Sequence, residues 1–414
     1  MRKQSKNLSR LKLHLWAVGR SLLGAALLLL IWTSPAQALT DDQRLINEVW
    51  RIVDRSYVDP SYNHQNWFAL REKALKKADD KREHTYALVQ EMMGALGDPF
   101  TRLLKPEQYR SLQTSTAGEL TGVGLQLAQD ADRKQLTVIA PIAGSPAAKA
   151  GIQPGDVIID VDGKSAAGLS LDEAAERMRG QAGTVVSLTI EHGGQAQNYD
   201  LVRDRIMLNP VVAELRSVAA KKIGYIRLNQ FNANAAEEVA ASIKKMEQQG
   251  ASGYILDLRN NPGGLLQAGV EIARDWMDQG DIVFTVSRSG ALDSYEANGN
   301  ALTADPLMVL VNKGTASASE ILAGALQDNG RGVIVGEQTF GKGLIQSLFD
   351  LSDGSGLAVT VAKYETPTHR DINKLGITPD VVVSVDSLTP DQIGTEADAQ
   401  YKAAIDQLTA SSSS

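Results

Sequence analysis

A serine that could act as a nucleophile stands at position 317, where a strand is expected to give way to a helix. The apolar run Leu307–Val311 predicts a short buried strand, and a helix begins just after Ser317. A helix N-terminus presents unpaired N–H groups and a positive dipole end, which stabilise a developing oxyanion. The same residues also fit a capping box, Ser317-x-x-Glu320. On this stretch alone, capping is the commoner explanation.

A second group with possible chemistry is Lys342, in Gly341-Lys-Gly343. A lysine acts as a general base only when its amine is neutral, so its pKa must fall from about 10.4 towards about 7–8. The flanking glycines let the backbone approach another element closely, and a neutral lysine can deprotonate a serine. A solvated lysine on a flexible turn is the ordinary alternative.

Two other chemistries compete for the same region. A Ser-His pair would have to use His369, for which a solvated loop histidine is the ordinary alternative. Residues 336–342 match the G-x-x-x-x-G-K of a phosphate-binding loop, but Gly343 replaces the Ser or Thr that would hold magnesium. A strand is also predicted where that motif needs a helix. No histidines and carboxylates cluster at a metal-ligand spacing, so neither a metal nor another cofactor is expected.

Length, charge and composition limit the class of protein. The chain has 414 residues, too many for one ordinary core, so two or three domains are expected. The net charge of −7 and the lack of a basic stripe beyond residue 20 argue against a nucleic-acid partner. The sequence contains no cysteine, which excludes disulfides, thiolate catalysis and cysteine-based zinc sites.

Residues 1–38 are predicted to be a secretory signal peptide. Residues 1–20 carry six basic side chains and no acidic one, an apolar run of eleven residues follows from Leu22 to Trp32, and Ala36-Gln-Ala38 supplies a cleavage site. A retained membrane anchor is the alternative, but the apolar run is short of the roughly 20 residues that cross a bilayer. The mature protein is therefore expected outside the cytoplasm.

The remaining chain divides into three predicted domains and a tail. Residues 39–116 show helical periodicity and predict a small helical domain. Residues 117–205 are rich in strands and glycine turns, and residues 206–388 alternate strand and helix, which is typical of an α/β core. Residues 389–414 are weakly patterned and are expected to form a tail.

The order of motifs in residues 117–205 resembles a PDZ domain. A glycine-rich loop is followed by strands, by further glycine turns and by a helix near Leu171–Met178. The resemblance implies that the loop binds the C-terminal carboxylate of a peptide, which then adds as a strand at the sheet edge. A PDZ-like fold that only packs against its neighbours is the alternative. The implied substrate-binding residues are Leu120, Thr121, Gly122, Val123 and Gly124.

The chain as a whole resembles the carboxyl-terminal processing proteases, a family of exported Ser-Lys peptidases with an embedded PDZ domain. The resemblance implies a multidomain α/β (α+β) fold with an N-terminal helical domain, a PDZ domain and an α/β Ser-Lys protease core. The motifs that carry it are Gly314-Thr-Ala-Ser-Ala-Ser-Glu320, Thr339-Phe-Gly-Lys-Gly343, Asp257-Leu-Arg-Asn-Asn-Pro-Gly-Gly264, Gly97-Asp-Pro99 and Gly376-Ile-Thr-Pro-Asp380.

The resemblance assigns catalytic roles by position. It implies that Ser317 is the nucleophile and Lys342 the general base. Gln346 matches the position that orients the lysine, and Glu320 matches one that assists. Whether Gln346 or Glu320 is the third catalytic residue stays open. Ser319 is the nearest rival nucleophile.

The resemblance also implies an oxyanion hole formed by the N–H groups of Gly263 and Ala318. A glycine suits this place because it lets the backbone come close to a substrate carbonyl. The expected substrate is a protein or peptide with a free C-terminus, and the oligomeric state stays open.

Within the family, the chain resembles the cyanobacterial and chloroplast members. This implies removal of the C-terminal extension of the membrane-bound photosystem II D1 precursor, in the thylakoid lumen or periplasm. Three alternatives remain: a non-catalytic PDZ peptide-binding scaffold, a general periplasmic protein-degrading protease, and a Ser-His hydrolase that uses His369.

Overall fold

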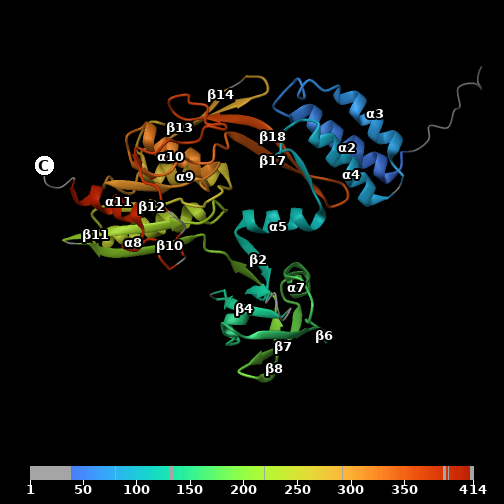
Figure 1. The fold of residues 1–414 in the computed structure, drawn as a ribbon, viewed down its shortest axis with the longest axis horizontal. Helices are drawn as coiled ribbons and strands as arrows, with labels where there is room; N and C mark the ends of the chain where they lie inside the picture. Colours follow the sequence, from blue (N-terminus) through green and yellow to red (C-terminus); the bar gives the residue numbers. More distant parts are fainter. Residues whose placement is uncertain are drawn as a thin grey trace, which may run out of the picture.

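A computed structural model of the chain describes residues 39–410, apart from Asp80, 130–134, Ala143, Ala219, Ala291, 386–387 and Pro390. The predicted signal peptide and residues 411–414 lie outside the described residues. Three regions follow one another along the chain: a group of helices, a small β domain and an α/β core (Figure 1). None of the helices in the described ranges is long and apolar enough to cross a bilayer.

The N-terminal helices form where apolar residues recur at helical spacing. In the first helix Leu45, Val49 and Val53 are fully buried, as the predicted stripe requires. Thr40 and Gln43 close its start with a capping box. The elements of this region are α2 (Asp41–Ser56), α3 (Trp67–Lys77), α4 (Arg82–Gly94), β1 (Arg102–Leu104) and α5 (Pro106–Ala117).

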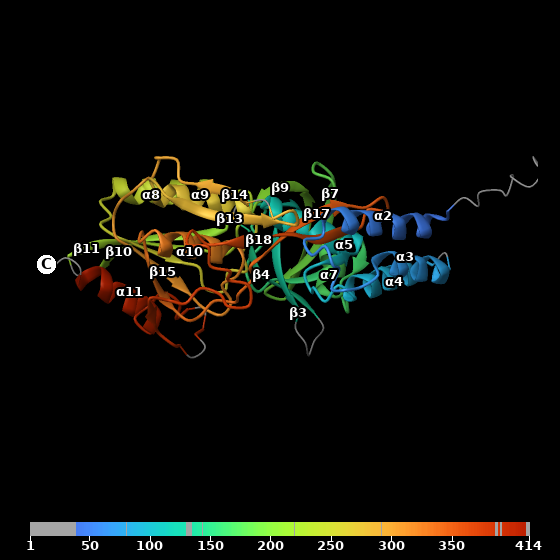
Figure 2. The same cartoon turned by 90° about the horizontal axis from the view of Figure 1, so that it is seen from above.

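A long β-hairpin from the C-terminal half of the chain reaches these helices. Its strands β17 (Leu344–Asp350) and β18 (Gly356–Glu365) pair antiparallel, and β18 also pairs with β1 (Figures 1 and 2). Leu357 and Val359 of the hairpin are buried in the same hydrophobic cluster as Val49. The helices therefore share their core with the hairpin, which belongs to the region predicted as the α/β core over residues 206–388.

The small β domain is joined to the rest of the molecule by a two-stranded ribbon. Its elements are β2 (Glu119–Gly122), β3 (Leu125–Gln129), β4 (Leu136–Pro141), α6 (Pro146–Lys149), β5 (Val157–Val161), β6 (Lys164–Ser165), α7 (Leu171–Met178), β7 (Val185–His192), β8 (Gln195–Val202) and β9 (Asp204–Met207). The ribbon pairs β2 with β9. The main sheet has the strand order β3-β4-β5-β7-β8, so β3 lies at an edge, and α7 packs beside it. The helix predicted near Leu171–Met178 is confirmed as α7.

The α/β core is built on one sheet with helices on both faces. Its strands, in order across the sheet, are β10 (Val211–Val218), β11 (Lys221–Leu228), β12 (Tyr254–Asp257), β15 (Leu307–Val311), β16 (Val333–Gly336) and β19 (Val381–Val382). From β11 onward the neighbours are parallel. One face is covered by α8 (Ala235–Gln248), α9 (Leu266–Trp276) and α10 (Ala318–Asp328), and the other by α11 (Ala399–Ala410).

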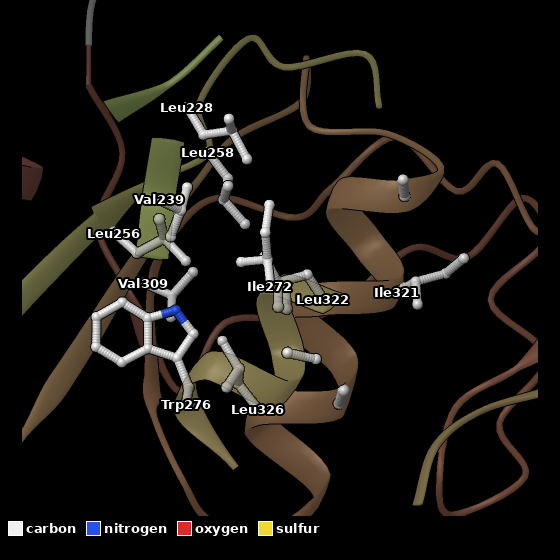
Figure 3. Packing of buried hydrophobic residues seen from close by; sticks show 14 of the residues in the cluster. Leu228, Val239, Leu256, Leu258, Ile272, Trp276, Val309, Ile321, Leu322 and Leu326 are labelled. Carbon is white, nitrogen blue, oxygen red and sulfur yellow. The ribbon is translucent and has the colours of Figure 1, made fainter. Parts of the chain in front are cut away.

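Alternate side chains of the central strands fill the two cores. Leu256 and Val309 lie with Trp276 of α9 in the larger cluster (Figure 3). Ile255 and Leu310, one position along, belong to the cluster that α11 covers. Because successive strand residues point to opposite faces, strands buried on both sides appear in the sequence as continuous apolar runs.

The C-terminal segment differs from the expectation. The sequence predicts a weakly patterned tail over residues 389–414, but α11 lies there and buries Tyr401 and Leu408 against the sheet. Its buried residues are Gln400, Tyr401, Ala404, Ile405 and Leu408, so a polar residue interrupts the apolar pattern of this face. The start of the helix is fixed because buried Arg259 forms ion pairs with Asp257 and Asp398.

A second sheet also contains a strand that the sequence did not indicate. Its elements, in spatial order, are β1, β18, β13 (Asp281–Ser287) and β14 (Leu292–Glu296). The sequence predicts a polar loop after β13, but β14 forms there because it pairs antiparallel with β13. The strand predicted over residues 381–385 is shorter in the structure, where β19 covers two residues.

The shared core predicts that a hairpin residue stabilises the N-terminal helices. Leu357→Ala should lower the free energy of unfolding by about 2–5 kcal/mol, since it leaves a cavity between β18 and the helices. Leu348→Ala, at a position on the same hairpin that is 38% exposed, should cost about 1 kcal/mol or less. Urea unfolding of both variants measures the difference, and equal stability would contradict the shared core.

Candidate active site

Ser317 occupies the turn between β15 and α10, and its backbone is strained. Its φ is 57° and its ψ −119°, whereas the caps Thr40, Ser145 and Ser170 are extended. A non-glycine residue in such a conformation costs roughly 1–3 kcal/mol. Glu320 accepts a hydrogen bond from the Ser317 N–H, and the Glu320 N–H donates at 2.8 Å to the Ser317 carbonyl oxygen rather than to its hydroxyl. The hydroxyl is therefore available for chemistry.

The carboxylate of Glu320 ties Ser317 to the loop that carries Lys342. It is fully buried and accepts a hydrogen bond of 2.9 Å from the Ser317 N–H. The N–H groups of Gly341 (2.7 Å) and Lys342 (2.9 Å) and the hydroxyl of Thr339 bind the same carboxylate. In a phosphate-binding loop such N–H groups would face a phosphate. Here a side chain of the protein takes that place, and a strand follows the loop, so the nucleotide-binding alternative has no structural support.

Tyr364 on β18 provides a second tie between the same two segments. Its hydroxyl shares its single proton between the carbonyl oxygen of Ser317, at 3.2 Å, and the carbonyl oxygen of Lys342. Burial raises the pKa of Tyr364 well above its ordinary value, so the phenol keeps its proton. Glu320 thus binds the N–H groups, and Tyr364 the carbonyl groups, of the serine and the lysine.

The side chain of Lys342 lies in a half-buried place between charged groups. Burial lowers the pKa of Lys342 below the usual lysine value and Arg102 lowers it further, whereas Asp98 and Glu320 raise it. The Nζ atom lies 4.9 Å from the centroid of the Phe100 ring. A lowered pKa is what a general base requires, because only the neutral amine accepts a proton.

Gln346 lies beside a register shift in the pairing of β17 with β18. Its amide NH₂ donates to the hydroxyl of Thr360 at 3.3 Å. Nowhere in the described structure does a hydrogen bond join Lys342 to Gln346 or to the hydroxyl of Ser317. The orienting role expected of Gln346 stays a prediction.

The two groups predicted to form the oxyanion hole lie beside the nucleophile. Gly263 has a φ of 94°, and a Cβ there would lie 2.9 Å from both the Ala318 nitrogen and the Ser317 Cβ, so only glycine permits this approach. The Gly263 N–H donates to the Asn261 side chain at 2.9 Å. The Ala318 N–H has no acceptor among the residues that the structure describes.

The rival groups are engaged elsewhere. Ser319 is fully buried and donates to the carbonyl oxygen of Asn261 at 3.0 Å. The ring of His369 stacks on Phe284, and its Nδ1 lies 2.9 Å from the carboxylate of Glu365. In the described ranges, no three His, Asp or Glu side chains are grouped as metal ligands.

Comparison with known proteins decides the family. The model of peptidase family S41 matches residues 222–383, and that of the PDZ domain matches residues 137–192. The chain is 57% identical to the carboxyl-terminal-processing protease of Synechocystis sp., over 95% of this chain and 93% of that protein. This chain belongs to the carboxyl-terminal processing proteases of peptidase family S41. The expected multidomain α/β fold, with its helical, PDZ and protease regions, is confirmed.

Other relatives of this processing protease are chloroplast proteins. The chloroplastic C-terminal processing peptidase of Tetradesmus obliquus is 47% identical, over 87% of this chain and 81% of that protein. Among solved structures, a photosystem II D1 C-terminal processing protease matches with a TM-score of 0.56 and 45% identity, over 86% of this chain and 98% of that one.

The PDZ domain of this processing protease carries a small apolar groove. The groove has a volume of about 230 Å³ and lies between the start of β3 and three residues of one face of α7, namely Leu171, Ala175 and Met178. Of the predicted substrate-binding residues, Leu120, Gly122, Val123 and Gly124 line it. Thr121 lines a separate hollow with Arg110 and Arg179.

Several residues around Lys342 could not be assigned from the sequence. Tyr364 and Thr360 lie on β18, and their side chains gave no signal beyond a strand pattern. Asp98 belongs to the Gly97-Asp-Pro99 motif that supported the family resemblance, but nothing in the sequence placed it, Phe100 or Arg102 beside Lys342. Only the pairing of β1 with β18 brings them there.

Because the Ser317 backbone is strained, one substitution, Ser317→Gly, is predicted to raise stability and to abolish activity. Ser317→Gly should raise the free energy of unfolding by roughly 0.5–1.5 kcal/mol, because glycine adopts a positive φ without strain. Peptide cleavage should be lost with the hydroxyl. Ser319→Gly, which removes a buried hydrogen bond, should instead lower stability by about 1–3 kcal/mol. Thermal and denaturant unfolding test this, and a Ser317→Gly variant less stable than wild type would contradict it.

The tie through Glu320 predicts a loss of turnover in Glu320→Gln. A glutamine presents one acceptor oxygen and an NH₂ group that faces N–H donors, so the serine and the lysine should shift apart. We expect kcat to fall by about 10²-fold and the free energy of unfolding to fall by about 1–3 kcal/mol. Glu337→Gln is the matched control, since Glu337 only meets Lys313 at 3.8 Å. Unchanged kcat in Glu320→Gln would refute the positioning role.

Proposed function

We propose that this processing protease is an exported serine endopeptidase with a Ser317–Lys342 dyad, and that it cleaves near the C-terminus of substrates held by its PDZ domain. The observation that carries the proposal is the strained turn of Ser317, where the carbonyl oxygen rather than the hydroxyl accepts the Glu320 N–H. The ties through Glu320 and Tyr364 support it, since both join the serine to the lysine. The lowered pKa of Lys342 is consistent with the role of base.

In the proposed reaction, the neutral amine of Lys342 takes the proton of the Ser317 hydroxyl while Oγ bonds to the substrate carbonyl carbon. The N–H groups of Gly263 and Ala318 stabilise the negative oxygen that forms. The C–N bond then breaks, and the lysine ammonium gives its proton to the leaving amine. Water, deprotonated by the lysine, hydrolyses the acyl-enzyme and restores the serine.

Two local movements would prepare this reaction. Lys342 Nζ has to leave Phe100 and reach the serine hydroxyl, which the flexible four-carbon stem of a lysine permits. The Gly263 N–H has to give up its hydrogen bond to the Asn261 side chain and donate to the oxyanion instead. Catalytic hydrogen bonds often tighten only when substrate is bound, so the described geometry fits a resting enzyme.

The PDZ groove supports recognition of an apolar C-terminus. Because β3 is an edge strand, a peptide can add to the sheet there while its last side chain enters the groove beside α7. A cleft of about 1260 Å³ lies on the other side of α7 and is lined by Glu173 and Arg177 of α7 and by Asp98 and Arg102. It offers a route from the PDZ domain towards Lys342, whose pKa the last two residues affect.

The proposed physiological reaction is removal of the C-terminal extension of the photosystem II D1 precursor, a membrane-bound protein. It rests on the names of the related proteins, one of which is a photosystem II D1 C-terminal processing protease. The cyanobacterial and chloroplastic relatives and the predicted signal peptide support a place in the thylakoid lumen or periplasm. General protein degradation remains the alternative for the same chemistry.

Three substitutions separate the candidate mechanisms. Ser317→Ala and Lys342→Ala should each lower cleavage of a peptide with a free C-terminal carboxylate by at least about 10³-fold, because nucleophile and base act as a unit. His369→Ala should retain activity, since His369 pairs with Glu365 instead. The rate of the wild-type enzyme should rise with pH as Lys342 loses its proton.

The outcomes of this set are distinct. Activity that survives in Lys342→Ala would exclude the Ser-Lys dyad. Loss of activity in His369→Ala would favour the Ser-His hydrolase, and a wild-type protein that binds the peptide without cleaving it would favour the PDZ scaffold. Amidation of the peptide C-terminus should weaken cleavage by the wild type, which tests the carboxylate recognition separately.

A further inference from the structure

The chain segment that leads from the N-terminal helices into β1 forms one wall around the catalytic lysine. A turn at Asp98 holds this segment, because the Asp98 carboxylate accepts hydrogen bonds from the Phe100 N–H at 2.9 Å and the Thr101 hydroxyl at 2.7 Å. The Thr101 hydroxyl accepts a hydrogen bond from the Thr360 N–H on β18. The half-buried Phe100 ring is therefore fixed from both sides, and Lys342 Nζ lies 4.9 Å from its centroid.

The same segment also binds the side chain of Gln346, through Thr360. Asp98 accepts a hydrogen bond of 2.6 Å from the Thr360 hydroxyl, which in turn accepts the amide of Gln346 at 3.3 Å. In the geometry described here, both the base and the residue expected to orient it therefore face the N-terminal segment rather than the nucleophile.

An aromatic ring attracts a lysine only in its charged form. The face of the ring carries negative charge density, so it stabilises an ammonium group over its face and offers little to a neutral amine. A neutral amine, by contrast, is the form that accepts a hydrogen bond from the serine hydroxyl. A position of the Lys342 amine at the Phe100 ring therefore favours the charged form, whereas a position beside the Ser317 hydroxyl favours the neutral form.

We propose that Phe100 is a positioning residue of the protease: its ring holds the protonated side chain of Lys342 away from Ser317 and releases it when the amine is neutral. The inference rests on the proposed Ser317–Lys342 dyad. The charged groups that face Lys342 are Asp98 from the same turn, Arg102 from β1 and Glu320 from α10. They stay in place when only the ring is replaced, so the contribution of the ring can be measured alone.

The test is the pH profile of kcat/KM in Phe100→Leu, which keeps an apolar side chain but removes the ring. Removing a contact that favours the ammonium form should let the lysine become neutral at lower pH. On the acid side of the profile, activity relative to the plateau should rise about three- to tenfold. Phe100→Tyr, which restores a ring, should return the wild-type profile.

Two controls make the outcome specific. Phe68→Leu removes an exposed phenylalanine of the same region that contacts Arg71, and its profile should match the wild type. The pH dependence of Ser317 modification by a small sulfonyl fluoride should shift with Phe100→Leu as well, independently of peptide binding. Phe100→Met, which also lacks a ring, takes the place of the leucine variant if that variant does not fold.

An unshifted profile in the ring-free variant would overturn the inference, and so would a loss of activity by one factor at every pH. The first would show that the ring has no effect on the charge state of the lysine. The second would show a structural role only. Failure of the proposed function is recognised separately, because Lys342→Ala would then retain activity.

Discussion

The carboxylate of Glu320 is buried at the start of α10 and accepts hydrogen bonds from the Ser317, Gly341 and Lys342 N–H groups and from the Thr339 hydroxyl. A buried charge is stable only when such donors surround it. If the loop with Lys342 moved away from the start of α10, the Glu320 carboxylate would lose its hydrogen-bond donors. This constraint holds Ser317 and Lys342, the proposed nucleophile and base, at one place, although Ser317 precedes α10 and Lys342 precedes β17.

The strain at Ser317 and the contacts around it belong to one arrangement. A positive φ at a serine persists only where the surroundings over-determine it. Glu320 holds the serine N–H, Tyr364 holds its carbonyl group, and the missing side chain of Gly263 leaves room for its Cβ. The hydroxyl is consequently the one polar group of Ser317 that takes no part in these hydrogen bonds within the described structure.

The protease core does not complete this site alone. The groups that surround the Lys342 amine include Asp98, Phe100 and Arg102, which precede the PDZ domain in sequence. They reach the site because β1 pairs with β18, whose hairpin also fills the core of the N-terminal helices. The PDZ domain is inserted in the chain between these two partners, β1 and β18.

The sequence by itself determined the local elements and the residue types. Strand β15 with the start of α10, the helix α7 and the family of the chain followed from apolar periodicity and from long ordered motifs. The local pattern around Ser317 fits a cap and a nucleophile alike, and only the resemblance of the longer motifs to the protease family favoured the nucleophile. Tertiary structure decided the rest: the φ of Ser317, the tie through Tyr364, the place of Phe100 and the packing of α11. These depend on pairings between segments far apart in the chain, which no local pattern records.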